Sequence, residues 1–513
     1  MGRKGMCLLL ALCCLTVLSG CSGRREEDRQ PVPTLPPAES YHVAPDQDEV
    51  ISEGGEYRIY LPGRDDLGLV SRSIELEPAD LSDTAEMLVR TLIAYPGDEE
   101  TRKLGGNRAL GLYGEDAVEV SGGVCTVNLT SSALQLSLRE YYKNCLALAT
   151  TLCELKEINS VNILTADQSV GLDITGNLPM GTLTAHPGEN LAVLWEQMEA
   201  KRTPLGEDLS KTPMSALATL YYPLQDGQGI ACATRLVSFE GQTPQQLAIG
   251  LINAVSSVRR STTGGQGFPE LSELLLHDPV TSELEEGGRL ITLSLSEDAE
   301  DLIKAGGADL ACTVAALTYT LTTFIPGIAA VCIRIGDRPI TELRTNHFET
   351  VTALGGLVKR NTVSSFLMGS TTVYLARNGI LCECERPVDR RLADSPRAQL
   401  CALMEGPDGR EQMEGIVATL PESVREDDIL GIRAEGDTLL VNLSEGFRSE
   451  IQERGPETEI LVCYSMVDTL CRNTGMKRVC FFFEGTQVET IAGAIYWAGE
   501  FLYNIGLAEK GLG

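Results

Sequence analysis

The four histidines are the side chains best suited to metal or acid–base chemistry. They are His42, His186, His277 and His347, and they stand far apart along the chain. None belongs to a His-Glu-x-x-His helix, and none is spaced to pair with another histidine or with a carboxylate cluster. We therefore expect four solvated loop histidines and no metal site.

Motifs for nucleophilic catalysis and phosphate binding are also missing from the sequence. No Gly-x-Ser-x-Gly elbow occurs, and Gly264-Gly265-Gln266-Gly267 lacks the Lys-Ser/Thr pair of a phosphate loop. The sequence predicts no catalytic residues, no cofactor and no enzymatic activity. An active site would have to form in a cleft between modules, and the sequence cannot reveal such a cleft.

Two asparagines occupy equivalent places, each followed by Leu and then by Thr or Ser. Asn128 and Asn442 could bind a wall sugar through their side-chain amides. In the alternative interpretation the asparagine lies on the outer face of a strand, and the following Thr or Ser ends the strand with a local backbone hydrogen bond. Ser294 stands at this place in the second of three similar segments, which favours the alternative. The ligand-binding residues therefore stay unknown.

The chain has sixteen cysteines, of which three precede Cys21 and twelve follow it. Most of the twelve stand inside apolar patterns, and a free cysteine behaves as a small buried hydrophobe. An exported protein could also form disulfides. Buried thiols are the favoured interpretation, and the redox state stays open. Cys382-Glu383-Cys384 alternates like a strand, and no Cys/His spacing matches a zinc site.

The N-terminus has the form of an export signal. Arg3 and Lys4 precede an apolar run that is too short to span a hydrocarbon core of ~30 Å. Leu18-Ser19-Gly20-Cys21 resembles the lipobox of bacterial lipoproteins, which implies a signal peptide at 1–20 and a diacylated Cys21. Two lipid chains give stable anchoring. The proline-rich residues that follow predict a disordered linker over 21–50.

The charge of the chain restricts its partners. The formal charge is −30, and loss of Arg3 and Lys4 with the signal would make it −32. Nucleic acid is disfavoured because phosphates require Lys and Arg. Direct electrostatic docking on anionic lipid is disfavoured for the same reason, so the lipid on Cys21 would have to supply the membrane affinity. Beyond the signal, no apolar stretch approaches 18 residues in length.

A strand–helix–strand cassette occurs three times and must position whatever the protein binds. An apolar strand is followed by an amphipathic helix and then by a second apolar strand. The helices share an apolar stripe at helical spacing. The three cassettes cover residues 124–164, 290–335 and 439–483. A period of this length indicates a repeated small domain, because solenoid repeats are roughly 20–50 residues long.

Each cassette has a similar front half. Two short strands joined by a turn, such as Asn378-Gly379, precede a helix in all three copies. The order predicted for each module is β-β-α-β-α-β. The fold class is α+β, with two helices packed on a mixed sheet in each of three tandem modules.

The repeat divides the chain into six segments. Ile491 to Ile505 place apolar residues at helical spacing, which predicts an amphipathic helix that caps the last module or docks a partner. The predicted segments are the signal at 1–20, the linker at 21–50, modules at 51–180, 214–345 and 369–490, and the C-terminal helix at 491–513.

The third module carries motifs of a known family. Tyr374-Leu375, Met404-Glu405-Gly406-Pro407, Thr419-Leu420-Pro421 and Val441-Asn442-Leu443-Ser444 resemble the GerMN domain of sporulation and spore-germination lipoproteins. The first and second copies keep fewer of these motifs. The resemblance implies a fold related to the ring-building modules of secretion-type assemblies, and a role in the spore envelope. Two copies are usual in the family, whereas this chain has three.

Together these features predict a non-catalytic scaffold or assembly factor on the outer face of the bacterial cytoplasmic membrane. Its expected partners are the lipid anchor in that membrane and envelope proteins of a sporulation or germination complex. Tandem modules without catalytic residues multiply binding surfaces. The alternative is a module that binds peptidoglycan or another wall glycan.

Overall fold

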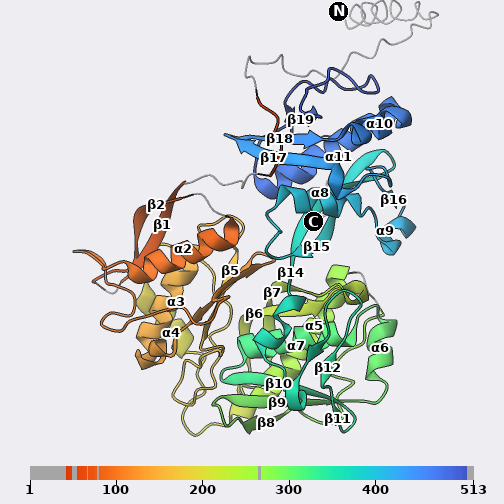
Figure 1. Ribbon diagram of the computed structural model, residues 1–513. Coiled ribbons are helices and arrows are strands. Elements are labelled where there is room, and N and C mark those ends of the chain that lie inside the picture. Colours follow the sequence, from red (N-terminus) through yellow and green to blue (C-terminus); the bar gives the residue numbers. More distant parts are fainter. Residues whose placement is uncertain are drawn as a thin grey trace, which may run out of the picture.

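A computed structural model describes residues 42–48, 55–65, 67–77, 80–263, 267–504 and 506. They form an α+β architecture in which small sheets and helices recur in three modules (Figure 1). The predicted signal at 1–20, Cys21 and the linker as far as Tyr41 lie outside the described residues. The exact limits of the modules stay predictions.

The first module contains two sheets with helices beside them (orange to yellow in Figure 1). β1 and β2 form an antiparallel hairpin, and the second sheet has the order β3-β4-β5 with β4 and β5 parallel. The elements are β1 (Gly55–Pro62), β2 (Leu69–Leu76), α2 (Leu81–Ala94), β3 (Val118–Ser121), β4 (Val124–Leu129), η1 (Ser131–Gln135), α3 (Leu138–Leu152), β5 (Ser160–Thr165) and α4 (Leu191–Glu199).

The second module repeats this plan and adds short strands at its end (green in Figure 1). Its hairpin is β6–β7, and its mixed sheet has the order β11-β10-β9-β8. The elements are η2 (Leu209–Lys211), β6 (Met214–Pro223), η3 (Gln225–Gly227), β7 (Ile230–Phe239), α5 (Pro244–Thr263), β8 (Val280–Glu283), β9 (Arg289–Leu295), α6 (Ala299–Ala305), α7 (Leu310–Phe324), β10 (Ile328–Ile335), β11 (Arg338–Pro339), β12 (Glu342–Leu343), β13 (Val351–Thr352), η4 (Leu354–Gly356) and η5 (Arg360–Phe366).

The third module has the sheets β15-β14-β16 and β17-β18-β19-β20 (blue-green to blue in Figure 1). Its long helix ends at Gly475, which takes the left-handed conformation with φ 71° that glycine tolerates. The elements are β14 (Met368–Arg377), β15 (Ile380–Asp389), α8 (Pro396–Met404), α9 (Gly409–Met413), β16 (Ile416–Val417), η6 (Glu426–Asp428), β17 (Ile429–Glu435), β18 (Thr438–Leu443), α10 (Glu445–Arg454), α11 (Pro456–Thr474), β19 (Arg478–Phe483) and β20 (Phe501–Leu502).

The structure confirms the α+β class and the repeated cassette, and it corrects the predicted strand order. In each cassette the two strands are parallel and a helix connects them: β4-α3-β5, β9-α7-β10 and β18-α11-β19. A further antiparallel strand precedes each cassette, namely β3, β8 or β17. The order is therefore β-β-α-β-β-α-β. The front hairpin lies in a sheet separate from the mixed sheet, and in the third module this sheet also includes β16.

One hydrogen bond recurs in all three modules and explains a repeated residue pair. The backbone N–H of Tyr60 donates to Thr151 Oγ1 at 2.9 Å, that of Tyr221 to Thr320 Oγ1 at 2.9 Å, and that of Tyr374 to Thr469 Oγ1 at 3.1 Å. Each threonine is fully buried on the long helix, directly before the leucine shared by the cassettes. The hydroxyl satisfies a strand N–H that would otherwise be buried without a partner.

The hydrophobic core follows the module boundaries only in part. Buried side chains of the first and second modules, from Ile59 to Leu367, form one continuous cluster. The third module has a separate cluster, from Val373 to Phe501. Asn162 of β5 links the first two modules further, because its buried side-chain oxygen accepts hydrogen bonds from Thr182 at 2.9 Å and Thr219 at 3.1 Å. The first two modules are thus packed as one body.

The predicted C-terminal helix at 491–513 is wrong for its described part. Residues 491–504 form bends, turns and the short strand β20, which pairs with β19. Gly493, at φ 96°, and Gly499 interrupt the helical pattern, because glycine is a poor helix former. The apolar residues cover the third module instead: Trp497 is fully buried and lies 5.3 Å from the ring of Phe481.

Asp468 on α11 binds this tail, and its carboxyl group should make the stability of the folded protein depend on pH. Its Oδ1 accepts the backbone N–H of Asn504 at 2.8 Å, and burial raises the pKa of its carboxyl group to about 6. The folded state therefore favours the protonated acid. This contribution to stability is complete below about pH 4, the unfolded value, and is lost as the pH rises through about 6.

Asp468→Asn should therefore stabilise the protein at pH 7 by on the order of 2 kcal/mol, because it keeps the side chain neutral. The gain should fade towards pH 4. Urea denaturation of both proteins between pH 4 and pH 7.5 measures it. A gain that grows towards low pH would contradict the proposed sign.

Residues 42–48, which we call the strap, lie against the third module although they precede the first (Figure 1). Pro45 O accepts a hydrogen bond from Asn442 Nδ2 at 2.9 Å, and Asp48 Oδ1 accepts one from the backbone N–H of Ile432 at 3.0 Å. Ala44 packs on a small apolar cluster formed by Leu440, Cys480 and Phe482. The predicted linker at 21–50 is thus wrong for these residues, which form a docked segment.

Candidate functional site: the junction of the three modules

A buried ion pair lies where the modules meet. Glu119 Oε1 of β3 lies 2.6 Å from Arg360 Nη2 of η5, and the two side chains are only 9% and 10% exposed. Charges removed from water to this degree require a close partner and further hydrogen bonds. The junction supplies both.

Aromatic rings of the second module surround the guanidinium of Arg360. Its central carbon lies 4.0 Å from the ring centre of Tyr319 and 5.5 Å from that of Tyr221. Tyr319 also donates its hydroxyl to Glu119 Oε2 at 3.3 Å. Stacking of a desolvated cation on aromatic faces adds about 2 kcal/mol. Arg360 thereby joins β3 of the first module to β6 and α7 of the second.

The third module reaches the same carboxylate through Arg390, which follows β15. Arg390 Nη1 lies 3.6 Å from Glu119 Oε2, and Nη2 lies 3.0 Å from Asp116 Oδ2. Ser121 Oγ donates to the carbonyl of Met368 at 2.6 Å, and Cys232 Sγ contacts the carbonyl of Ser121 at 3.2 Å. These polar contacts hold all three modules together at one point.

Beside this junction a cleft separates the first module from the third. A cavity of about 250 Å³ is lined by Ser121, Gly122 and Glu157 on one side and by Thr372 and Arg472 on the other, among other residues. A neighbouring hollow of about 440 Å³ continues along α2 to the end of α11. The lining is mixed in charge, with carboxylates and cations on both walls.

Asp394 lies in the wall of both hollows. Partial removal from water, together with the charges of Asp80 and Glu157, raises the pKa of its carboxyl group to about 6. The residues that line the two hollows include serines and threonines but no histidine or cysteine. The cleft is therefore suited to binding polar groups.

The asparagines that suggested sugar binding have structural partners. Asn128 donates to Asp167 Oδ1 at 2.6 Å and accepts the N–H of Asp167 at 3.0 Å. Asn442 donates to Pro45 O and accepts the N–H of Gly485 at 3.0 Å. Each amide fastens the turn that follows the neighbouring parallel strand. Both side chains are buried and engaged, which favours a structural role over sugar binding.

All four histidines lie in loops, as predicted. His186 pairs with Glu189 at 2.9 Å, His277 contacts the carbonyl of Asp278, and His347 donates its backbone N–H to Thr345. His42 differs from the predicted solvated state, because it is largely buried between Glu435 and Glu500. Sequence spacing could not indicate this, since these carboxylates stand at the other end of the chain.

All twelve cysteines after Cys21 are free in the structure, and ten of them are buried. This agrees with the prediction of buried thiols. Cys382 and Cys384 lie in strand β15, as their alternation indicated. Cys21 lies outside the described residues, and its lipidation stays a prediction.

Comparison with known proteins places the third module in a family. Residues 372–489 match the family Germane, described as sporulation and spore germination. The third module is thus a GerMN-like domain, as its motifs predicted, and the description names a biological process rather than an enzymatic reaction. A comparison with curated proteins gave no match.

Two solved structures resemble parts of the chain. One contains the tandem GerMN domains of the sporulation protein GerM from Bacillus subtilis, with 16% identity, 53% of this chain and 92% of that chain covered, and a TM-score of 0.21. The other is a putative lipoprotein from Clostridium perfringens, with 16% identity, 26% of this chain and 87% of that chain covered, and a TM-score of 0.19. TM-scores of this size do not establish a common overall arrangement.

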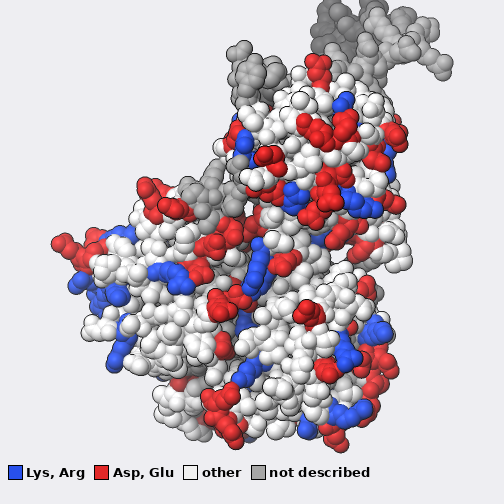
Figure 2. Space-filling model, in the orientation of Figure 1, with Lys and Arg blue, Asp and Glu red and all other residues white. Residues whose placement is uncertain are grey.

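The charged side chains on the surface agree with the net negative charge of the sequence. Acidic side chains are scattered over all three modules on the face shown in Figure 2, with basic side chains between them. Within the described part of the chain, no helix is long and apolar enough to cross a membrane.

Proposed function

We propose that the protein is a lipid-anchored, extracytoplasmic scaffold that assembles a sporulation or germination complex through protein–protein contacts. The observation that carries this proposal is the match of the third module to the sporulation and germination family. The buried junction supports it, because Glu119, Arg360 and Arg390 hold three modules in a fixed relation. A rigid array presents several binding surfaces at defined distances.

The third module offers an apolar surface for such a contact. Ile380, Met413 and Val417 are 46%, 84% and 56% exposed. They lie on or beside the sheet β15-β14-β16, near the turn of its hairpin. Apolar side chains that remain exposed together are candidates for protein contacts. We propose that an envelope protein of the complex binds here.

The contact can be tested by cross-linking in sporulating cells of the host. Met413→Glu combined with Val417→Glu should abolish the cross-linked species of the third module, because two charges would be buried in the interface. Leu205→Glu is the matched control, since Leu205 is 89% exposed in a loop between the first two modules. Equal cross-linking of all three proteins would overturn the proposed contact.

Anchoring is tested separately. Cys21→Ala should move the protein from the membrane fraction to the soluble fraction, because the proposed lipid on Cys21 supplies the membrane affinity. The wild-type protein should be released by detergent but not by high salt. Release of the wild type by salt alone would contradict a lipid anchor.

A second candidate function is the binding of peptidoglycan in the cleft between the first and third modules. The polar lining of this cleft favours it. Co-sedimentation of the mature chain with purified peptidoglycan should then saturate, and Asp394→Ala with Arg472→Ala should weaken it at least tenfold. Absence of saturable binding would exclude this alternative and leave the scaffold proposal intact.

A further inference from the structure

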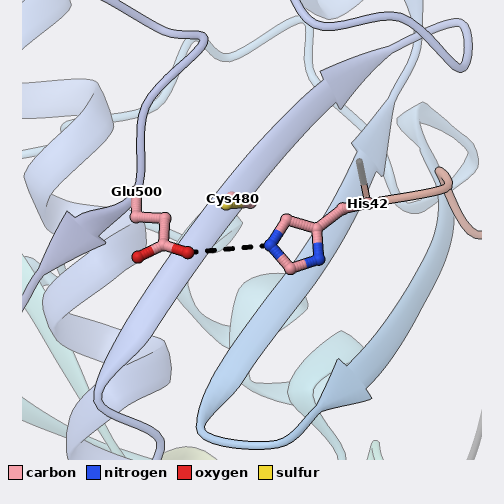
Figure 3. Close-up of side chains that lie close together, drawn as sticks. All are labelled: His42, Cys480 and Glu500. Carbon is pink, nitrogen blue, oxygen red and sulfur yellow. Dashed lines mark ion pairs between the residues drawn. The ribbon is translucent and has the colours of Figure 1, made fainter. Parts of the chain in front are cut away.

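Three side chains that coordinate metals in other proteins come together where the strap meets the third module. His42 belongs to the strap, Cys480 to the central part of β19, and Glu500 to the tail just before β20. One potential ligand atom of each lies within 4.8 Å of the others, and the three side chains converge on one point (Figure 3). No other such group occurs among the residues that the structure describes.

The imidazole of His42 is oriented as in metal sites. Its Nδ1 lies 2.8 Å from Glu435 Oε2, and its Nε2 faces Glu500 Oε1 at 3.6 Å (Figure 3). A histidine ligand almost always donates its other ring N–H to a carboxylate or carbonyl, which fixes the tautomer and directs the second nitrogen at the metal. Glu435 is placed to accept that hydrogen bond.

The other two ligands are also fixed in position. Cys480 is 1% exposed, and its Sγ contacts the carbonyl of Gly499 at 3.9 Å. Arg478 Nε lies 3.3 Å from Glu500 Oε2, which leaves Oε1 as the oxygen directed at His42. Tetrahedral zinc with nitrogen at ~2.1 Å and sulfur at ~2.3 Å requires ligand atoms about 3.5 Å apart. The separation of His42 Nε2 and Glu500 Oε1 already fits this value, and Cys480 offers a ligand atom within 4.8 Å of both.

We propose that His42 Nε2, Cys480 Sγ and Glu500 Oε1 bind one Zn²⁺ ion, which clips the strap to the third module. Nitrogen, thiolate and carboxylate ligands together suit zinc, and a water molecule would complete the tetrahedron. Binding converts the Cys480 thiol to a thiolate and releases one proton to solvent. His42 coordinates as the neutral imidazole and keeps the proton on Nδ1.

Two arginines engage the carboxylate oxygens that do not face the three ligand atoms. A divalent ion deprotonates a coordinating thiol, so a bound Zn²⁺ would be held by a thiolate and a carboxylate. Arg478 pairs with Glu500 Oε2, and Arg433 Nη2 lies 2.5 Å from Glu435 Oε1. Each arginine thus neutralises the carboxylate oxygen that does not face His42. The three ligand atoms are thus left facing one another.

The proposal is tested on the mature chain without its lipid, after removal of metal with a chelator. We expect one equivalent of Zn²⁺ to bind with a Kd below about 1 μM in competition with a chromophoric chelator. Co²⁺ should give a thiolate-to-metal charge-transfer band, which reports on the sulfur ligand. Zn²⁺ should also slow proteolysis of the strap, a readout independent of the spectrum.

Three variants distinguish this site from incidental binding. His42→Ala should weaken Zn²⁺ binding at least a hundredfold and remove the protection of the strap. Cys480→Ser should abolish the charge-transfer band. His186→Ala, which removes a histidine paired with a single glutamate on the first module, should bind like the wild type. The proposal is overturned if the wild type binds no stoichiometric zinc, or if His42→Ala binds as well as the wild type. It is independent of the proposed scaffold role.

Discussion

Glu119→Gln is expected to lower the free energy of unfolding by about 3 kcal/mol, because it leaves the guanidinium of Arg360 buried without its counter-charge. The two groups are 2.6 Å apart and almost inaccessible to water. Arg390 would lose the same partner, so the third module should also separate more easily from the first. Chemical denaturation of the mature chain measures the change.

An exposed pair provides the control. Glu297→Gln removes the partner of Arg338 at 3.1 Å, but these side chains are 70% and 80% exposed, so the cost should stay below about 1 kcal/mol. Combining Glu119→Gln with Arg360→Met should recover part of the loss, because no buried charge remains unpaired at that pair. If both glutamine variants unfold alike, the buried pair does not stabilise the junction.

Trp497→Ala should cost about 3–5 kcal/mol and detach the tail from the third module. The indole is fully buried among Phe481, Phe483 and Phe501. Its Nε1–H donates to Glu459 Oε1 at 2.7 Å, and Glu459 is itself fully buried. The alanine therefore leaves a cavity and a carboxylate that has lost a donor, and both effects destabilise the fold.

The neighbouring Tyr496→Ala is the matched control, because Tyr496 is 38% exposed and its loss should change stability by about 0.5 kcal/mol at most. Thermal denaturation together with near-ultraviolet circular dichroism follows both variants. Equal melting temperatures for the two would show that the tail contributes little to the third module.

Much of the fold could be predicted from the sequence because the long helices and parallel strands are strongly periodic. The cassettes, the front hairpins and the α+β class are all present in the structure. Strands such as Val118–Ser121 and Val280–Glu283 were missed because four residues give too short a pattern to recognise. The tail was misassigned because apolar residues at helical spacing also fit a chain that folds back on its own module.

The junction and the strap could not be predicted, because each depends on residues that are remote in sequence. Glu119 and Arg360 are 241 positions apart, and neither stands in a recognisable motif. The sequence assigns His42 to a polar linker, and its partner Glu435 stands 393 positions further along the chain. Only the folded chain brings such groups together. The family resemblance could be recognised because it depends on local turn and strand motifs, and these are confined to single modules.

The strap also determines how a mechanical force would enter the molecule. With the proposed anchor at Cys21, at most about 75 Å of chain separates the lipid from His42, whatever its conformation. Tension at the anchor would first load the strap and, through Pro45 and Asn442, the third module. The first module would carry load only after the strap has peeled away. With that anchor, the third module would be the attachment point nearest the bilayer, and undocking of the strap would release it.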